Sequence, residues 1–183
     1  TGLMTLSGSV GIRFVITGKD TLSKGYYLGL DGISMEPKRV YIPEWYILGP
    51  FPNPHKFGLI RRGLDSAYLP EKLVDLKKDY HGAKEQPIHW TYVQTPDNGC
   101  LSLVDKVNPH EMVVTYAVTY IYSPDNHKTK LFIGTDDGGK VFFNGQEIYR
   151  YLGDRLAEPD QAEIDLTMKP GWNTLLLKIE NNF

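Results

Sequence analysis

The sequence predicts an all-β chain, folded as an antiparallel β-sandwich or jelly roll with at most one short helix. Three observations lead to this fold class. Apolar and aromatic residues alternate with period two from Val113 to Tyr120, the dipeptide Asn144-Gly145 separates two short apolar runs, and turns rich in Gly, Pro, Asn and Asp recur between short strand-like runs. No alternation of helices with strands of the parallel α/β type is present.

The first elements are short strands. Residues 11–17 place Ile12, Phe14 and Ile16 on one face, residues 26–30 form a second apolar run, and residues 41–48 form a third. We expect Gly49-Pro50 to end the third strand, because both residues favour turns.

One helix or helical turn is expected at residues 70–80. Leu73, Leu76 and Tyr80 have helical spacing there, and Pro70 suits a first helical turn.

The second half of the chain predicts longer strands. After the strand at 113–120, residues 130–133 form another strand, and 140–143 and 146–149 form a hairpin about Asn144-Gly145. Residues 173–180 follow the turn pair Pro170-Gly171 and place Leu175, Leu177 and Ile179 on one face.

Composition and charge exclude several classes of protein. Lysine and arginine total 20 against 22 aspartates and glutamates, so the net charge of −2 argues against a nucleic-acid partner and against binding to anionic membranes. Cys100 is the sole cysteine, so an intramolecular disulfide and a cysteine zinc cluster are excluded. The chain begins at Thr1 without a signal peptide and has no apolar run long enough to span a bilayer, and we expect it to be a processed product or a fragment.

A domain boundary is predicted near residue 38. The charged, proline-bearing stretch Met35–Arg39 connects two strand-rich blocks, 1–38 and 39–183. The first block is too small to bury a core alone, so we expect it to be the terminal strands of a preceding β domain or an extension packed on the second block.

The second block carries five motifs in order. They are Trp45-Tyr46-Ile47-Leu48-Gly49-Pro50-Phe51, then Leu64-Asp65-x-x-Tyr68-x-Pro70-Glu71, then Ile88-His89-Trp90, then the run Gly134 to Gly145 (GTDDGGKVFFNG), and then the run Lys169 to Lys178 (KPGWNTLLLK). Together they resemble the galactose-binding-like β-sandwiches of bacterial glycan-degrading proteins. In that pattern a further strand follows, so the resemblance implies that the final strand is missing from 39–183 or supplied by a following segment.

The first block shows a shorter resemblance. The run Phe14 to Asp31 (FVITGKDTLSKGYYLGLD) is similar to the closing strands of jelly-roll glycoside hydrolases that act on furanosides, the difructose-dianhydride synthase/hydrolase type. None of its residues matches the catalytic carboxylates of that family, which would lie upstream.

These resemblances imply a function. We expect a non-catalytic module of a secreted or periplasmic bacterial protein that binds polysaccharide or oligosaccharide, or that braces an upstream catalytic domain. Two alternatives remain open. The first is that the chain is a C-terminal β-sandwich fragment of a glycoside hydrolase and contributes to the active-site wall or the oligomer interface of that enzyme. The second is that the chain is a structural adhesion or assembly domain.

Aromatic residues near predicted loops are the candidate sugar-binding residues, because sugar C–H faces stack on flat rings. They are Tyr92, Tyr122, Tyr149 and Tyr151. The three tryptophans, Trp45, Trp90 and Trp172, are instead expected in the core, because they lie within strand motifs.

Asp136 and Asp137 are the candidate polar and metal-binding residues. Adjacent loop carboxylates can accept hydrogen bonds from sugar hydroxyls or coordinate calcium, and the sequence suggests no other cofactor. They can equally serve only to shape a tight turn.

Catalytic signals are weak. A glycosidase needs two facing carboxyl groups, and no spacing selects a pair among Glu44, Asp65, Glu71, Asp75, Asp79, Glu111 and Glu147. The five histidines show no metal-binding spacing, and no nucleophile or phosphate-loop motif occurs. No catalytic residue is therefore assigned.

Overall fold

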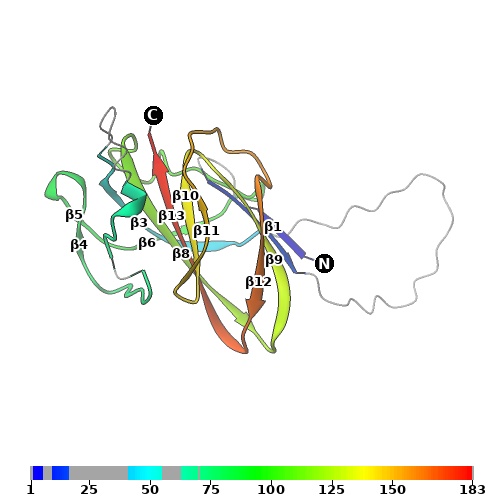
Figure 1. Ribbon diagram of the computed structural model, residues 1–183. Coiled ribbons are helices and arrows are strands. Elements are labelled where there is room, and N and C mark those ends of the chain that lie inside the picture. Colours follow the sequence, from blue (N-terminus) through cyan, green and yellow to red (C-terminus); the bar gives the residue numbers. More distant parts are fainter. Residues whose placement is uncertain (1, 6–9, 17–40, 55–62, 70, 183) are drawn as a thin grey trace, which may run out of the picture.

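The alternating strands pair into two large antiparallel sheets (Figure 1). The computed structural model describes residues 2–5, 10–16, 41–54, 63–69 and 71–182, with side chains from residue 41 onward. The elements are β1 Gly2–Thr5, β2 Val10–Ile16, β3 Glu44–Pro52, η1 Gly63–Asp65, β4 Tyr80–His81, η2 Ala83–Glu85, β5 Pro87–Ile88, β6 Thr91–Gln94, β7 Cys100–Leu101, β8 Val113–Ser123, β9 His127–Thr135, β10 Gly139–Phe143, β11 Gln146–Tyr151, β12 Ala162–Met168 and β13 Gly171–Asn181.

One sheet has six strands in the order β11-β10-β13-β8-β3-β6, and the other has five, with the path β1-β2-β9-β12 and β7 paired to β2. The all-β antiparallel fold class is therefore confirmed. No helix in the described part of the chain is long and apolar enough to cross a bilayer.

The first block contributes strands to the five-stranded sheet. β2 pairs antiparallel with β9 from Val10 opposite Thr135 to Val15 opposite Lys130. The predicted strand at 26–30 and the boundary near residue 38 lie outside the described residues, so the division into 1–38 and 39–183 stays a prediction.

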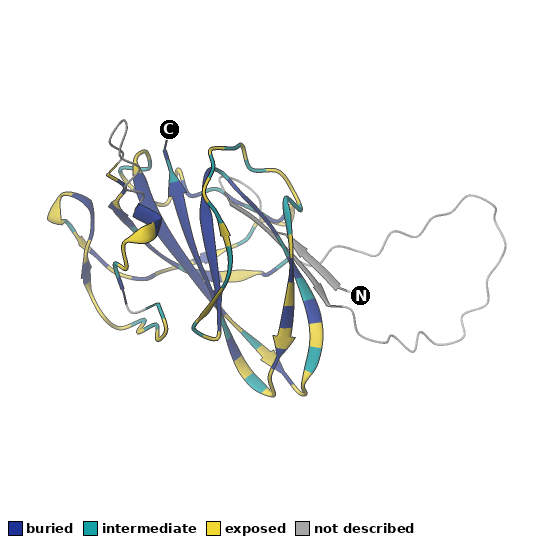
Figure 2. Cartoon of the chain, viewed as in Figure 1, coloured by how far each residue is buried: buried dark blue, intermediate teal, exposed yellow. Residues whose placement is uncertain are grey.

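The main core lies between the two sheets. Alternate residues of the longest strands point into it, such as Ala117 of β8 and Leu175 and Leu177 of β13. Burial is nearly continuous along β8, β10 and β13 (Figure 2). These strands carry apolar side chains on both faces, so their sheet must be covered on both sides.

A second core covers part of the outer face of the six-stranded sheet. The residues between β3 and β6, here called the covering segment (63–69 and 71–90), pack Leu69, Tyr80 and Trp90 onto Tyr116 and Leu176 of the sheet. The molecule thus has three layers, with the covering segment on one side and the five-stranded sheet on the other (Figure 1).

Two predictions about these elements are wrong. Residues 71–80 form turns and extended chain rather than a helix. Asp75 accepts a hydrogen bond from Lys77 N at 2.9 Å and so stabilises a local turn. Leu73 is exposed, whereas Leu76 packs on the second core. β3 also continues past Gly49-Pro50. A bulge between Leu48 and Phe51 lets pairing with β8 resume at Phe51 opposite Val114.

Candidate functional site

The covering segment leaves one end of the six-stranded sheet open, and aromatic side chains gather there. Directly paired residues of antiparallel strands share a face, so Trp172 of β13 lies beside Tyr122 of β8 and Tyr46 of β3 lies beside Tyr92 of β6. Tyr120 is two residues from Tyr122 along β8 and shares its face. This surface is here called the aromatic face; it crosses four neighbouring strands, β13, β8, β3 and β6.

The rings of the aromatic face are open to solvent. Trp172 is 70% exposed, Tyr122 61%, Tyr92 46% and Tyr120 37%, and these are the four most exposed aromatic side chains in the described part of the protein. Trp172 and Tyr122 meet edge to face with ring centroids 5.5 Å apart, and Tyr46 and Tyr92 do so at 5.6 Å. The rings therefore brace one another in two pairs.

Polar side chains lie among the rings. Glu44 and Gln94 are a directly paired couple on β3 and β6, both exposed, and each is two residues from Tyr46 or Tyr92 on the same face. Thr174 of β13 is paired with Tyr120 and is half-buried. The surface thus combines flat apolar rings with hydrogen-bonding groups.

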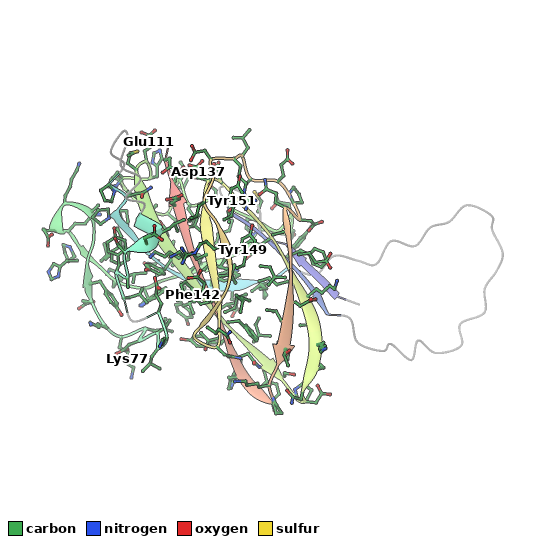
Figure 3. All side chains as sticks on the ribbon, viewed as in Figure 1. Lys77, Glu111, Asp137, Phe142, Tyr149 and Tyr151 are labelled. Atoms are coloured by element: carbon green, nitrogen blue, oxygen red, sulfur yellow. The ribbon has the colours of Figure 1, made fainter. Side chains whose placement is uncertain are left out.

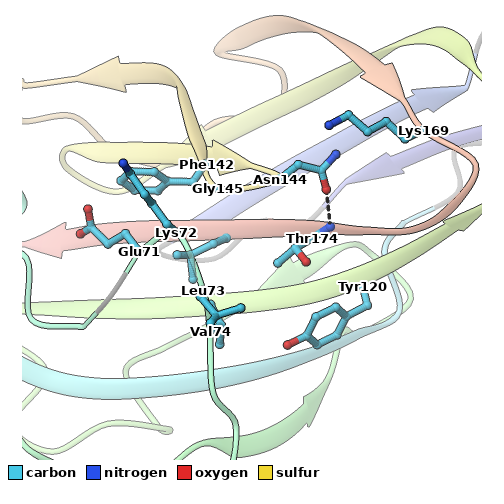
Figure 4. Close-up of a pocket in the computed structure, with 11 residues that line it drawn as sticks. Glu71, Lys72, Leu73, Val74, Tyr120, Phe142, Asn144, Gly145, Lys169 and Thr174 are labelled. Atoms are coloured by element: carbon cyan, nitrogen blue, oxygen red, sulfur yellow. Dashed lines mark hydrogen bonds between the residues drawn. The ribbon is translucent and has the colours of Figure 1, made fainter.

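A cleft of about 330 Å³ opens beside the aromatic face (Figure 4). Its lining comes from the covering segment, the sheet and two turns: Glu71, Lys72, Leu73, Val74, Tyr120, Phe142, Asn144, Gly145, Lys169, Thr174 and Leu176. Tyr120 and Thr174 belong to both the cleft and the aromatic face, so the two form one continuous surface.

The Asn144-Gly145 turn shapes one end of the cleft. Both residues have positive φ, 50° and 78°, as a two-residue hairpin requires, which confirms the predicted hairpin. A Cβ at Gly145 would lie 2.9 Å from the carbonyl oxygen of Lys72, so the covering segment packs directly on the turn. The Asn144 side chain is fixed as well, because it donates to Asn173 Oδ1 at 2.9 Å. It also accepts from Thr174 N at 3.0 Å (Figure 4).

The single carboxylate of the cleft is part of a buried ion pair. Glu71 Oε1 accepts hydrogen bonds from Lys178 Nζ at 3.1 Å and from the hydroxyl of Tyr116 at 2.7 Å. Lys178 also donates to the carbonyls of Leu64 at 2.9 Å and Ser66 at 2.5 Å. Burial lowers the pKa of Lys178. Burial also raises the pKa of Tyr116, and the hydrogen bond from the Tyr116 hydroxyl to Glu71 raises it further. This cluster fastens the covering segment to the sheet.

A second group of ion pairs borders the same segment. Lys140 Nζ lies 3.3 Å from Asp65 Oδ1, and Arg150 Nε donates to Glu147 Oε1 at 2.7 Å. The bond from Arg150 lowers the pKa of Glu147. Three of the seven candidate catalytic carboxylates, Asp65, Glu71 and Glu147, are therefore paired with cations.

Asp136 and Asp137 lie in the turn between β9 and β10, and neither belongs to the aromatic face or lines the cleft. Asp137 is buried, and its oxygens accept hydrogen bonds from the backbone N–H groups of Asn182 at 2.7 Å and Arg155 at 3.3 Å. Asp136 Oδ1 accepts from Asp137 N at 3.1 Å, and burial raises the pKa of the Asp136 carboxyl. Within the described ranges no group of three or more His, Cys, Asp or Glu residues could hold a metal ion. These contacts suit the turn-shaping role, and calcium stays a prediction.

The structure separates the four predicted tyrosines. Tyr92 and Tyr122 lie on the aromatic face, whereas Tyr149 and Tyr151 lie on β11, at the opposite edge of the sheet (Figure 3). Tyr149 packs against the main core, and the Arg155 guanidinium lies 3.9 Å from the ring centroid of Tyr151.

The core assignment of the tryptophans holds for two of three. Trp45 is fully buried and Trp90 is 7% exposed, but the assignment of Trp172 is wrong. Trp172 follows the Pro170-Gly171 turn at the start of β13 and is not part of the second core, so its ring is exposed to solvent.

Sequence reasoning missed Tyr46, Tyr120, Lys72 and Lys169 as well. Tyr120 ends the predicted strand at 113–120 and Tyr122 follows two residues later, so their spacing carried a signal, because residues two apart along a strand share a face. Which face stays open depends on the covering segment, and no local pattern encodes that.

No protein-family model matches this sequence, and comparison with curated proteins and with solved structures also gave no match. The galactose-binding-like resemblance of the motifs therefore stays a prediction.

Proposed function

We propose that this chain is a non-catalytic carbohydrate-binding module and that glycan binds on the aromatic face and in the adjoining cleft. The observation that carries the proposal is the gathering of the four most exposed aromatic rings, Trp172, Tyr122, Tyr92 and Tyr120, on one sheet face. Flat rings offer stacking area for sugar C–H faces, and the polar neighbours Glu44, Gln94 and Thr174 offer partners for hydroxyls.

The dimensions of the face suit an oligosaccharide. Neighbouring strands lie roughly 4.8 Å apart, so the four strands β13, β8, β3 and β6 span roughly 14 Å across the sheet. Tyrosine and tryptophan lose little conformational entropy on binding, and here they are further braced in edge-to-face pairs. A preorganised surface of this kind supports binding without rearrangement.

The pairing of the carboxylates supports a binding role over hydrolysis. A glycosidase requires two facing carboxyl groups roughly 5–10 Å apart with one free to donate a proton. In the described cleft, the carboxylate of Glu71 already accepts hydrogen bonds from Lys178 and Tyr116. The motif resemblance adds the setting, an accessory module of a secreted bacterial glycan-degrading protein whose catalytic domain lies upstream.

The test is affinity electrophoresis of the purified chain in gels containing neutral and acidic polysaccharides. We expect retardation in at least one gel, and loss of that retardation in Trp172→Ala. The control is Leu156→Ala, which removes a similarly exposed apolar side chain, 79% exposed against 70% for Trp172, from the loop before β12. Equal retardation of both variants, or none for the folded wild type, would overturn the proposal.

A second candidate is that the chain is an assembly domain whose aromatic face docks on a second copy of the chain. Exposed tyrosine and tryptophan are enriched in protein interfaces, and within the described part of the chain Trp172, Tyr122, Tyr92 and Tyr120 are exposed. Light scattering distinguishes this candidate, since a self-associating face gives a concentration-dependent mass that Trp172→Ala abolishes. A monomer that binds polysaccharide excludes self-assembly through this face.

A further inference from the structure

The aromatic face carries two separate ring pairs, and neither pair is flat. The ring planes of Trp172 and Tyr122 meet at 70°, and those of Tyr46 and Tyr92 meet at 64°. In each pair the edge of one ring therefore points toward the face of the other. Each pair forms a corner between two rings rather than a level platform, and the two are here called the Trp172 corner and the Tyr92 corner.

The two corners are offset diagonally across the sheet. The Trp172 corner joins β13 to β8 at Tyr122, and the Tyr92 corner joins β3 to β6. Tyr46 pairs with Val118, which lies four residues before Tyr122 on β8. With roughly 3.3 Å per residue and roughly 4.8 Å between strands, the corners lie roughly 13 Å apart along the strands and roughly 10 Å apart across them. This diagonal is longer than a disaccharide.

Hydrogen-bonding groups form a row between the two corners. On β8, Tyr120 lies midway between the corners and is paired with Thr174 of β13. On β3, Glu44 lies two residues before Tyr46 and is paired with Gln94 of β6. The antiparallel register of β3 and β8 places Glu44 in the same row as Tyr120. A ligand that joins the two corners must cross this row, where its hydroxyls meet polar partners.

The ring angles decide what shape of ligand can use both rings of a corner. A flat ligand, such as the surface of a crystalline polysaccharide, can lie against only one ring of each corner. The second ring meets that surface at a steep angle and loses most of its contact, because dispersion attraction falls steeply with separation. A single glycan chain can instead place one sugar unit in each corner and turn between them about its glycosidic bonds.

We infer that the ligand of this surface is a single extended glycan chain, bound through several consecutive sugar units from the Trp172 corner past Tyr120 to the Tyr92 corner. This inference rests on the proposed function and names its ligand class. The ring angles exclude the flat surface of a crystalline polysaccharide. A lone terminal sugar is excluded because it reaches only one of the two corners.

The experiment titrates the whole chain calorimetrically with three series of oligosaccharides: cellobiose to cellohexaose, maltose to maltohexaose, and chitobiose to chitohexaose. In at least one series the hexasaccharide should bind about tenfold more tightly than the disaccharide, because only the longer chain reaches both corners. The insoluble polymer of that series (crystalline cellulose, granular starch or crystalline chitin) should bind the chain about tenfold more weakly than the hexasaccharide does, as measured by pull-down.

Two variants and a control test the path of the ligand. Trp172→Ala and Tyr92→Ala each remove one corner, so each should flatten the increase in affinity with chain length. Leu152→Ala removes a side chain that is exposed almost as much as Tyr92, 45% against 46%, from the loop after β11. This control should leave the increase with chain length intact.

Three results overturn this inference and leave the proposed function intact. They are equal affinity for the disaccharide and the hexasaccharide, equal or tighter binding to the insoluble polymer, and an affinity of Tyr92→Ala that still rises with chain length as in the wild type. A folded chain that binds no oligosaccharide of the three series and none of the three polymers overturns both.

Discussion

Trp172 and Tyr122 lie directly opposite each other on β13 and β8, with ring centroids 5.5 Å apart at an interplanar angle of 70°. Each ring is more than half exposed, at 70% and 61%. Such a pair contributes little to folding while presenting two rigid rings to solvent. It is the feature around which the proposed binding surface is organised.

The two strand-motif tryptophans Trp172 and Trp45 should separate binding from stability. Trp172→Ala is expected to lower the free energy of unfolding by less than about 1 kcal/mol, because the side chain is mostly exposed. Trp45→Ala empties a fully buried position and should cost about 3–5 kcal/mol. Urea unfolding followed by circular dichroism measures both, and similar costs for the two variants would contradict the placement of Trp172.

The buried ion pair predicts a large effect of Lys178→Met. Removal of the ammonium leaves Glu71 and the carbonyls of Leu64 and Ser66 without their donor, and we expect a loss of about 3–5 kcal/mol of unfolding free energy. The double variant K178M/E71Q should recover part of that loss, since it removes the uncompensated carboxylate. Chemical denaturation of the single and double variants measures both values. A small loss for Lys178→Met, or no recovery in the double variant, would contradict this role of the Lys178–Glu71 pair in stability.

Gly145 and Gly171 offer a matched test of how the cleft is shaped. Both have positive φ, 78° and 90°, so alanine at either position should cost about 1–2 kcal/mol of backbone strain. At Gly145 an added Cβ would lie 2.9 Å from the carbonyl oxygen of Lys72, whereas at Gly171 it would have no heavy atom within 4 Å. Gly145→Ala alone should therefore displace the covering segment and weaken glycan binding. Equal effects of both variants on affinity would contradict this account of the cleft.

Asp136 should make stability depend on pH at the acid end. Burial raises its folded-state pKa above the usual value near 3.8, so its contribution is fully present below the unfolded-state pKa and is lost as the pH rises through the folded-state pKa. Asp136→Asn keeps an oxygen to accept the N–H of Asp137, so it should raise stability at pH 7 and change little at pH 3. Thermal melts at the two pH values test this, and destabilisation at pH 7 would show that the charge is needed there.

Calcium addition tests the second role suggested for Asp136 and Asp137. Because the oxygens of Asp137 already accept backbone hydrogen bonds from Asn182 and Arg155, we expect the melting temperature to be the same in millimolar CaCl₂ and in EDTA. A higher melting temperature in CaCl₂ than in EDTA, abolished by Asp136→Asn, would instead identify a calcium site.

Local patterns predicted most of the fold. The alternation along 113–120 and the Asn144-Gly145 pair predicted β8 and the β10–β11 hairpin, because period and turn chemistry act over a few residues. The expected helix at 70–80 was wrong because Leu76 and Tyr80 pack on the second core from turns and irregular chain, while Leu73 is exposed to solvent. Tertiary packing decided that segment, and sequence spacing carries no record of it.

The candidate site was harder to predict for the same reason. Trp172 and Trp90 both occur in strand motifs, yet Trp90 lies in the second core and Trp172 on the open face. Tyr92 and Tyr122 were found from their residue type and their place near predicted loops, whereas Lys72 and Lys169 line one cleft only because the chain returns to the Asn144-Gly145 turn from both sides. Such long-range meetings follow from the topology rather than from any local pattern.

Protection of Trp172 from acrylamide quenching tests the central claim most directly. The other two tryptophans are buried, so Trp172 dominates the accessible fluorescence. Addition of the oligosaccharide that binds most tightly should reduce the quenching constant severalfold in the wild type, and Trp172→Phe should remove that accessible signal. Saturable sugar binding that leaves the quenching of Trp172 unchanged would contradict a binding site on the aromatic face.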